Sequence, residues 1–285
     1  MATLRDIRRR ISSIQKTRQI TRAMQMIAAA RLRRAQETTL KWRSYVEKMT
    51  GVVERLIDRT GEKTHPLLAS KEPQKLEILV ITSDKGLCGG FNLSVCQRVD
   101  QFIAQNREKF EDISLTVIGK KGRDYFKKRP VKIRQEFVEV LGGLSDEWIK
   151  SLSKGIIDDY LADTFDTLYL FYHRFKSVLQ QVVVEERQLP LKEAGAQEIP
   201  IDYLFEPDRK SVLDKVLPQY LEARVYAALY ESITSEHAAR MSAMNLATKN
   251  AIEMIDVLTL TYNKVRQEVI TTELMDIVGG AEALT

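Results

Sequence analysis

The stretch ARMSAMNLATKNAIEMIDVLTLTYNKVRQEVITTELMDI, residues 239–277, decides the fold of this chain. It lies within a run from Val212 to about Val278 that has no glycine and one early proline, Pro218. A second run, from Thr3 to about Asp58, has no proline and only one glycine, Gly51. At ~1.5 Å per residue, helices of these lengths would extend roughly 100 and 80 Å. A globular domain cannot cover helices that long, so each must bury its apolar stripe mainly on the other.

Apolar residues recur at steps of three and four along both runs, as a coiled coil requires. The first seam comprises Leu4, Ile7, Ile11, Ile14, Arg18, Thr21, Gln25, Ala28, Leu32, Ala35, Thr39, Trp42, Val46, Met49, Val53 and Leu56. The second comprises Leu213, Val216, Tyr220, Ala223, Ala227, Tyr230, Thr234, His237, Met241, Met244, Thr248, Ala251, Ile255, Leu258, Tyr262, Val265 and Val269. The seven-residue repeat predicts a left-handed supercoil. Between Arg18 and Gln25 the first seam is polar, and there we expect either contact with a third surface or looser pairing.

The ends of both helices are marked in the sequence. Thr3-x-x-Asp6 and Ser211-x-x-Asp214 are capping-box patterns, which predict the two starts. Gly61 and the pair Gly279–Gly280 predict the two ends. Pro218 predicts either a kink in the early turns or a start delayed by a few residues.

The two runs flank one central segment, so their near ends meet there and the helices should pair antiparallel. The second helix is about ten residues longer, which gives an overhang of roughly 15 Å at its tip. The overhanging sequence, ELMDIVGGAEAL, is fairly apolar and has no expected partner within the chain. An exposed apolar segment of this kind predicts a binding surface.

Residues 70–205 alternate between strand and helix patterns. Strands are expected at 76–81, 115–118, 131–140, 168–172 and 181–186, and helices from after Asn92 to about Lys109, at 120–128 and at 146–163. This alternation predicts a small α/β domain with a Rossmann-like, mainly parallel sheet. The expected fold class is therefore α/β, with a long antiparallel two-helix coiled coil. Its expected segments are a coiled-coil helix over 1–60, the α/β domain over 70–205 and a coiled-coil helix over 211–285 that pairs with the first.

Composition excludes several classes of protein. With 44% hydrophobic and 29% charged residues, no apolar run approaches the ~20 residues that span a bilayer. The start, MATLRDIRRR, lacks the apolar segment of a secretory signal, and the helical pattern runs too far for a transit peptide. Cys88 and Cys96 form neither a disulfide framework nor a metal motif, and the three histidines form no cluster. We expect no metal and no cofactor, and His237 on the second seam indicates a packed core histidine.

Positive charge is concentrated at the start of the chain. Residues 1–43 carry a net charge of +10, whereas the whole chain carries +5, so the remainder carries −5. A basic helix suits nucleic acid, an anionic membrane or an acidic protein surface, or is simply a solvated face. The stretch has little aromatic interleaving and no nucleic-acid-binding module, so nucleic acid is the least favoured partner.

One loop invites a chemical interpretation. SDKGLCGGFN, residues 83–92, follows a strand and opens a helix, where α/β folds bind phosphates. Its spacing, Gly86-x-x-Gly89-Gly90, matches neither GxGxxG nor GxxxxGK[ST], which favours a tight structural turn. No grouping of nucleophile, base and orienting residue is evident, so we expect no catalytic residue in this chain.

These stretches together resemble the gamma subunit of the F-type ATP synthase, in its bacterial form. The resemblance rests on LRDIRRRISSIQKTRQITRAMQMIAAARLRRAQ, SDKGLCGGFN, IDYLFEPD and the final ARMSAMNLATKNAIEMIDVLTLTYNKVRQEVITTELMDIVGGAEAL, which span essentially the whole chain in order. It implies a central rotor shaft whose coiled coil enters a hexameric head of alpha and beta subunits. It further implies an α/β domain beside the epsilon subunit, with a foot on the membrane ring of c subunits.

The resemblance also implies a function, a set of contacts and a location. Ion-driven rotation of the shaft would force each beta catalytic site through its conformational cycle, for ATP synthesis or hydrolysis. Beta-subunit contacts are implied at Arg266, Gln267, Thr271 and Arg240, and a c-ring foot at Asp202, Tyr203, Leu204, Phe205 and Glu206. The basic helix Arg8–Arg34 would suit acidic beta surfaces. The location implied is the cytoplasmic face of the cell membrane, reached only through the complex.

Two other classes stay open from the residues alone. The chain could be a nucleotide-dependent enzyme that uses its α/β domain, with the helices as a dimerisation arm. It could also be a passive coiled-coil tether, which would self-dimerise rather than form a hairpin. Plant chloroplast relatives carry an inserted segment with a regulatory cysteine pair, which has no counterpart between Cys96 and Asp146. Thiol-based regulation is therefore not expected.

Overall fold

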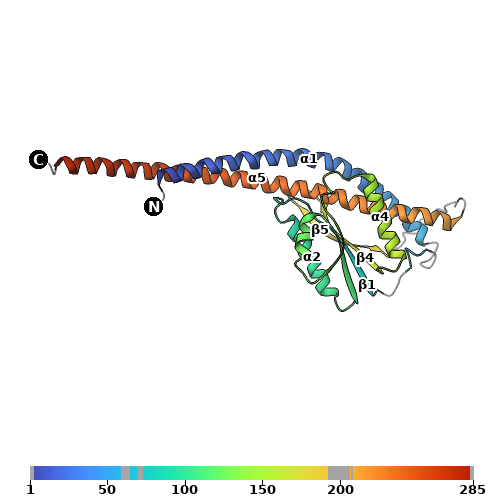
Figure 1. The fold of residues 1–285 in the computed structure, drawn as a ribbon. Helices are drawn as coiled ribbons and strands as arrows, with labels where there is room; N and C mark the ends of the chain where they lie inside the picture. Colours follow the sequence, from blue (N-terminus) through green and yellow to red (C-terminus); the bar gives the residue numbers. More distant parts are fainter. Residues whose placement is uncertain (1–2, 59–64, 70–72, 192–205, 207, 283–285) are drawn as a thin grey trace. The chain divides into compact units, whose positions relative to one another are not determined.

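The computed structural model describes residues 3–58, 65–69, 73–191, 206 and 208–282. It has two long helices, α1 (Leu4–Asp58) and α5 (Arg209–Glu282), at the two ends of the element order (Figure 1). The chain packs as two compact units, and each is described by itself. The smaller unit joins Met1–Ala28 to Met241–Thr285, and the larger unit is Ala29–Arg240.

The predicted seams are the buried stripes of both helices. Every residue of the first seam is buried or half-buried, and so is every residue of the second as far as Val265. In the smaller unit, the hydroxyls of Thr21 and Thr248 lie 2.8 Å apart, and Gln25 donates to Asn245 at 3.3 Å. The helices therefore run antiparallel, as predicted. The polar part of the seam does not loosen, because its side chains bond across the pair.

The same antiparallel pairing continues within the larger unit. Thr39 donates to the Tyr230 carbonyl at 3.1 Å, and its hydroxyl lies 2.8 Å from that of Thr234. Trp42 stacks on Tyr226 with ring centroids 4.2 Å apart. Small and polar seam positions are thus satisfied by direct bonds between the two helices, which is how a seam with few large apolar residues stays paired.

The ends of the helices agree only in part with the sequence patterns. The cap at Thr3 and Asp6 is confirmed, since the Thr3 hydroxyl donates to the Asp6 carboxylate at 2.7 Å. The cap proposed at Ser211 and Asp214 is wrong: Asp208 accepts from the Ser211 amide at 2.9 Å and from its hydroxyl at 2.7 Å. An aspartate just before the first helical residue is the stronger cap, since its oxygens reach the unpaired amides of the first turn.

The structure also decides between other end signals. α5 begins at Arg209 and contains Pro218, which excludes a delayed start, and the kink stays a prediction. α5 also continues through Gly279 to Glu282, because glycine weakens a helix without ending it. α1 ends at Asp58, and Gly61 lies outside the described residues.

The central strands form one five-stranded sheet in the order β3-β2-β1-β4-β5. The strands are β1 (Lys75–Ile81), β2 (Asp112–Ile118), β3 (Lys132–Phe137), β4 (Thr167–Phe175) and β5 (Gln181–Leu189). The first four are parallel, and β5 is antiparallel to β4. The predicted, mainly parallel α/β sheet is therefore confirmed.

Three helices join the strands and help to cover the sheet. They are α2 (Phe91–Asn106), α3 (Lys120–Phe126) and α4 (Asp146–Leu161). One core cluster packs α2 against the sheet through residues such as Val95, Val99 and Phe171. The other packs the opposite face against α4 and the parts of α1 and α5 that belong to this unit (Figure 1).

A buried carboxylate ties the sheet to α4. Glu77 of β1 is 1% exposed and accepts hydrogen bonds from Ser114, Thr116 and the Arg134 guanidinium. Arg134 of β3 also pairs with Asp159 of α4. A buried charge persists only when it is paired and hydrogen-bonded, and this network meets both conditions.

Candidate interaction surfaces

The far end of α5 is uncovered within the smaller unit. Leu258, Tyr262 and Val265 are half-buried, but every described side chain from Arg266 to Gly279 is exposed. The register explains the change, because the pairing of Thr21 with Thr248 places Leu4, the first residue of α1, opposite Val265. The bare end therefore begins near Arg266. The expected overhang of about ten residues was too short, and the observed one extends roughly 25 Å.

The bare end has two chemically different faces. Apolar side chains on it are exposed by between 38% and 68%: Val269, Ile270, Leu274, Met275, Ile277 and Val278. Arg266, Ile270 and Leu274 follow one another at four-residue spacing, so they share a face. Glu268, Thr272 and Asp276 follow the same spacing on another face. Glu273, three residues after Ile270 and four before Ile277, lies on the first face, which is therefore apolar with one arginine and one glutamate. The second face carries the two carboxylates of Glu268 and Asp276.

Three predicted contact residues lie on this end. Arg266 and Gln267 are exposed, and among the described residues their side chains make no hydrogen bond or ion pair. The Thr271 hydroxyl donates to the Gln267 carbonyl at 2.8 Å, which leaves its oxygen able to accept another bond. The structure brings these three together on one uncovered segment, where they are free to meet another molecule.

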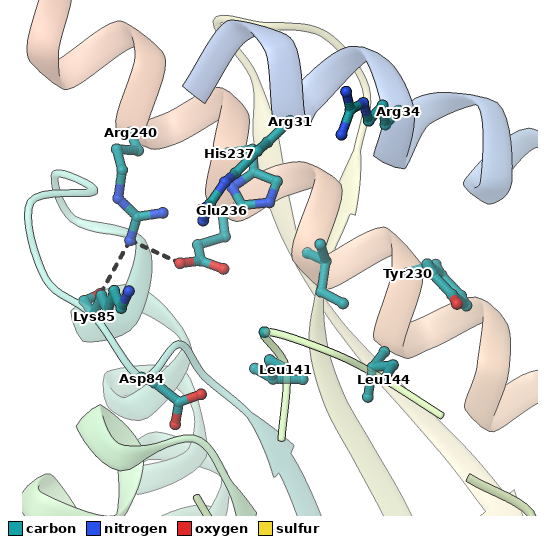
Figure 2. Close-up of a pocket in the computed structure, with 12 residues that line it drawn as sticks. Arg31, Arg34, Asp84, Lys85, Leu141, Leu144, Tyr230, Glu236, His237 and Arg240 are labelled. Atoms are coloured by element: carbon teal, nitrogen blue, oxygen red, sulfur yellow. Dashed lines mark hydrogen bonds and ion pairs between the residues drawn. The ribbon is translucent and has the colours of Figure 1, made fainter. Parts of the chain in front are cut away.

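A cavity of about 370 Å³ lies between α1, α5 and two loops at the carboxyl edge of the sheet (Figure 2). Its lining comprises Arg31, Arg34, Asp84, Lys85, Leu141, Gly142, Leu144, Tyr230, Ile233, Glu236, His237 and Arg240. Within the part of the chain that the structure describes, the guanidinium groups of Arg31 and Arg34 have no ion pair. The four cations outnumber the two carboxylates, so the cavity carries net positive charge.

Burial shifts the pKa of two side chains that line this cavity, His237 and Glu236. Burial, together with the nearby charges of Arg240 and Arg31, lowers the pKa of His237 to about 4, so this ring is neutral near pH 7. Burial raises the pKa of Glu236, while the charge and hydrogen bond of Arg240 oppose that shift. The positive charge of the cavity therefore comes from its arginines and lysine and not from histidine.

Arg240 points inward within the larger unit. Its guanidinium donates to the carbonyls of Lys85 at 3.2 Å and Gly86 at 3.1 Å, and it pairs with Glu236 at 2.7 Å (Figure 2). Only 11% of its side chain is exposed. The predicted contact of Arg240 with a beta subunit stays a prediction, and the structure shows a contact within the chain that the sequence did not indicate.

The loop of residues 83–92 is held by its own polar groups. Asn92 accepts from the Ser83 amide at 2.8 Å and donates to the Ser83 hydroxyl at 2.8 Å. The Asp84 carboxylate accepts from the amides of Lys120 and Glu139, both at 2.9 Å. The Asp84 carboxylate thus ties this loop to the start of α3 and to the segment after β3. This bonding supports the interpretation of the loop as a structural turn.

The predicted foot lies almost entirely outside the described residues. Asp202, Tyr203, Leu204 and Phe205 are not described, and Glu206 is exposed at a bend shortly before α5. In the described ranges, no group of histidine, cysteine or acidic residues could hold a metal ion. Among the helices as far as they are described, none is both long and apolar enough to cross a bilayer.

Taken together, these features define a class: a coiled-coil protein with a small α/β domain and an uncovered helix end. A family model described as ATP synthase matches residues 3–284. The ATP synthase gamma chain of Anaeromyxobacter sp. (strain K) is 46% identical over 289 residues and all of both chains. That of Geobacter metallireducens is 43% identical over 286 residues, covering 100% of this chain and 99% of the other.

Solved structures agree on the fold. A chain of the central stalk and c-ring structure of Tetrahymena thermophila mitochondrial ATP synthase matches with a TM-score of 0.62 and 25% identity, over 80% of this chain and 99% of the other. A chain of the Euglena gracilis OSCP/F1/c-ring structure matches with a TM-score of 0.72 and 20% identity, over 99% and 94%. The chain belongs to the ATP synthase gamma-chain family, and is thus a subunit of the central stalk of that complex.

Proposed function

We propose that this chain is the shaft that couples ion-driven rotation of a c-ring to the conformational cycle of the beta catalytic sites. The observation that carries the proposal is the bare end of α5, where the fourteen consecutive residues from Arg266 to Gly279 are all exposed. A helix that leaves Leu274 and Ile277 in water is normally covered by a partner. The hexameric head of alpha and beta subunits is the partner we assign to it.

Asymmetry makes such a contact useful. A shaft changes a catalytic subunit only if it contacts that subunit differently in two states. A uniform rod would bias three equivalent sites equally. The bare end has a largely apolar face with Arg266 and another face with Glu268 and Asp276, so its contact with each beta subunit would change as it turns.

The basic cavity suits a second contact with the head. Arg31 and Arg34 lie one helical turn apart and line the cavity together with Lys85. Carboxylates are the natural partners of free guanidinium groups, which bind them with paired hydrogen bonds. We assign this cavity to an acidic surface of a beta subunit, in line with the basic character of Arg8–Arg34.

The remaining assignments follow from membership of the family. We propose that residues 1–60 and 211–285 form the shaft, and that residues 70–205 form the foot, with Asp202–Glu206 against the c-ring and the epsilon subunit nearby. The chain would supply no catalytic residue of its own and would lie at the cytoplasmic face of the membrane as part of the complex.

The test replaces Arg266 and Gln267 together by alanine in the assembled head. Both side chains are exposed and unbonded within the described chain, so we expect no change in the stability of the isolated protein. We expect ATPase activity of the complex to fall by roughly tenfold or more, the loss of one or two charge-assisted hydrogen bonds. Lys264→Ala is the matched control, since its only described pairing is a 4.0 Å contact with Glu268 on the exposed surface.

Two outcomes would count against the proposal. Equal ATPase activity in the double variant, the control and the unaltered complex would contradict the contact assigned to Arg266 and Gln267. A pull-down from cell membranes in which the chain did not co-purify with alpha and beta subunits would contradict the shaft function.

A further inference from the structure

Within the larger unit, α5 is bonded to the carboxyl edge of the sheet at successive turns. Glu231 accepts from the Phe175 amide, at the end of β4, at 2.8 Å. The Ser235 hydroxyl donates to the His173 carbonyl of β4 at 3.1 Å. Arg240 then reaches the carbonyls of the loop between β1 and α2. The contact at Arg240 differs from the other two because it binds a loop and not a strand.

The tip of this loop has little apolar packing to hold it. Leu87 is 62% exposed and adopts a positive φ of 62°, a conformation that a leucine rarely occupies. Gly89 also has a positive φ, of 59°, and both Gly89 and Gly90 are exposed. A strained and exposed segment keeps its place only when surrounding bonds hold it. The Ser83 hydroxyl donates to the Lys85 carbonyl at 2.7 Å, and Asn92 donates to the buried Cys88 at 3.2 Å. Among the described residues, the Gly86 carbonyl accepts only from Arg240.

Arg240 is built to hold the tip. Its planar guanidinium donates to two successive carbonyls, those of Lys85 and Gly86, and is fixed from the other side by Glu236. Glu236 is itself 8% exposed, so its carboxylate is held beside the arginine and away from water. Lysine cannot reproduce this arrangement, because an ammonium group lacks the fork of parallel donors.

The same loop is also hydrogen-bonded to the segments that follow β2 and β3. Asp84, one residue before Lys85, accepts from the amides of Lys120 and Glu139. These residues follow β2 and β3, the two strands on the side of β1 away from β4. A continuous chain of polar contacts therefore runs from α5 through Arg240, Lys85 and Asp84 to that half of the sheet.

We infer that Arg240 is a positioning residue, which clamps the loop Asp84–Gly90 to α5 so that the helix and the far strands turn as one body. This inference rests on the proposed shaft function, since only a rotating shaft makes such a clamp part of the coupling. It adds a path for torque inside the chain, separate from any contact with the head.

Three variants separate the clamp from general destabilisation. Arg240→Gln removes the paired donors but leaves Glu236 buried without its cation. The double variant Glu236→Gln with Arg240→Gln removes both charges and so leaves no unpaired buried charge. Glu236→Gln alone keeps the bonds from Arg240 to the loop. Lys249→Gln, an exposed residue of α5 in the smaller unit, is the control for loss of one positive charge.

The first measurement is the set of backbone NMR order parameters of the isolated full chain. The order parameters of Gly86–Gly90 should fall from the rigid range of about 0.85 towards about 0.6 in Arg240→Gln and in the double variant, because the bonds that fix the loop carbonyls are lost. Values in β1 and β4 should not change, and Glu236→Gln and Lys249→Gln should leave the loop rigid. A uniform fall over the whole sheet, or an unchanged loop in Arg240→Gln, would overturn the clamp.

The second measurement is ion pumping per ATP hydrolysed by the complete membrane enzyme. We expect this ratio to fall at least twofold in the double variant, with Arg240→Lys intermediate and Lys249→Gln unchanged. A freed loop with an unchanged pumping ratio would overturn the role in coupling while leaving the shaft intact. Loss of alpha and beta subunits from the purified complex would instead contradict the shaft proposal.

Discussion

The two ends of α5 both carry large apolar side chains, but those side chains are buried at one end and exposed at the other. On the sheet, Leu213, Leu217, Leu221 and Leu229 are each 1% exposed or less. At the bare end, Leu274 and Ile277 are 57% and 68% exposed. The sequence of either part predicts an amphipathic helix, but only the first finds its apolar partner inside the chain.

This difference separates residues that fold the chain from residues that serve its assembly. The bare end continues a helix that is already formed, so it carries no nucleation cost, but its apolar side chains stay in water. Burial of those side chains, and the stability that burial brings, therefore requires a partner. Changes on the sheet side should affect the isolated chain, and changes at the bare end should affect only the complex.

The largest expected effect comes from a matched pair of leucine substitutions. Leu229→Ala removes a side chain that is fully buried, and should lower the free energy of unfolding by roughly 2–5 kcal/mol. Leu274→Ala should change it by less than about 0.5 kcal/mol. Urea unfolding of the isolated chain measures both. The comparison fails if Leu274→Ala proves as costly as Leu229→Ala.

A smaller effect is expected from pH, and it too should be confined to the larger unit. Burial lowers the pKa of His173 to about 4, against an ordinary value of 6.5. Between pH 6.5 and 4 the unfolded chain therefore binds a proton that the folded chain does not. The free energy of unfolding should decrease as pH falls through this window, by on the order of 3 kcal/mol for His173.

His237 should act in the same direction, since its pKa is also lowered to about 4. Glu236 acts in the opposite direction. Because its pKa is raised, the folded chain binds this proton at a higher pH than the unfolded chain does, which stabilises the folded chain as pH falls. Urea unfolding at pH 7, 5.5 and 4.5 measures the sum. His237→Gln should flatten the dependence, and an identical slope in that variant would exclude this histidine as a contributor.

The smallest effect expected here tests the polar seam. Thr39→Val leaves the buried Thr234 hydroxyl without its partner, and should cost roughly 1–3 kcal/mol. Replacing both threonines by valine removes both polar groups at once and should recover most of that loss. A double variant less stable than the single one would show that the hydroxyl pair is not what holds this layer together.

Periodicity was sufficient for the elements of this fold and for its seams. The three- and four-residue steps from Leu4 and Leu213 identified the buried stripes, since that spacing is dictated by helix geometry. Local signals for helix ends were less reliable. Ser211 is a residue type that caps helices, but Asp208 caps this one, and Gly279 is a residue type that ends helices, but α5 continues through it. The length of the bare end depends on register, which the pairing of Thr21 with Thr248 sets and which no single helix reveals.

Some of the site residues could be predicted from the sequence, and others could not. Arg266, Gln267 and Thr271 were named by resemblance, and the structure shows them uncovered without showing what covers them. The inward bonds of Arg240 could not be predicted, because they depend on the path of a loop more than 150 residues away in the sequence. Glu77 is similar, since its partners come from two other strands of the sheet.

Amide hydrogen exchange across residues 266–279, in the free chain and in the assembled complex with alpha and beta subunits, tests the central claim most directly. We predict fast exchange in the free chain and strong protection in the complex, with little change over Leu213–Leu229. Exchange that stays fast in the assembled complex would contradict the claim that the head covers this end of α5.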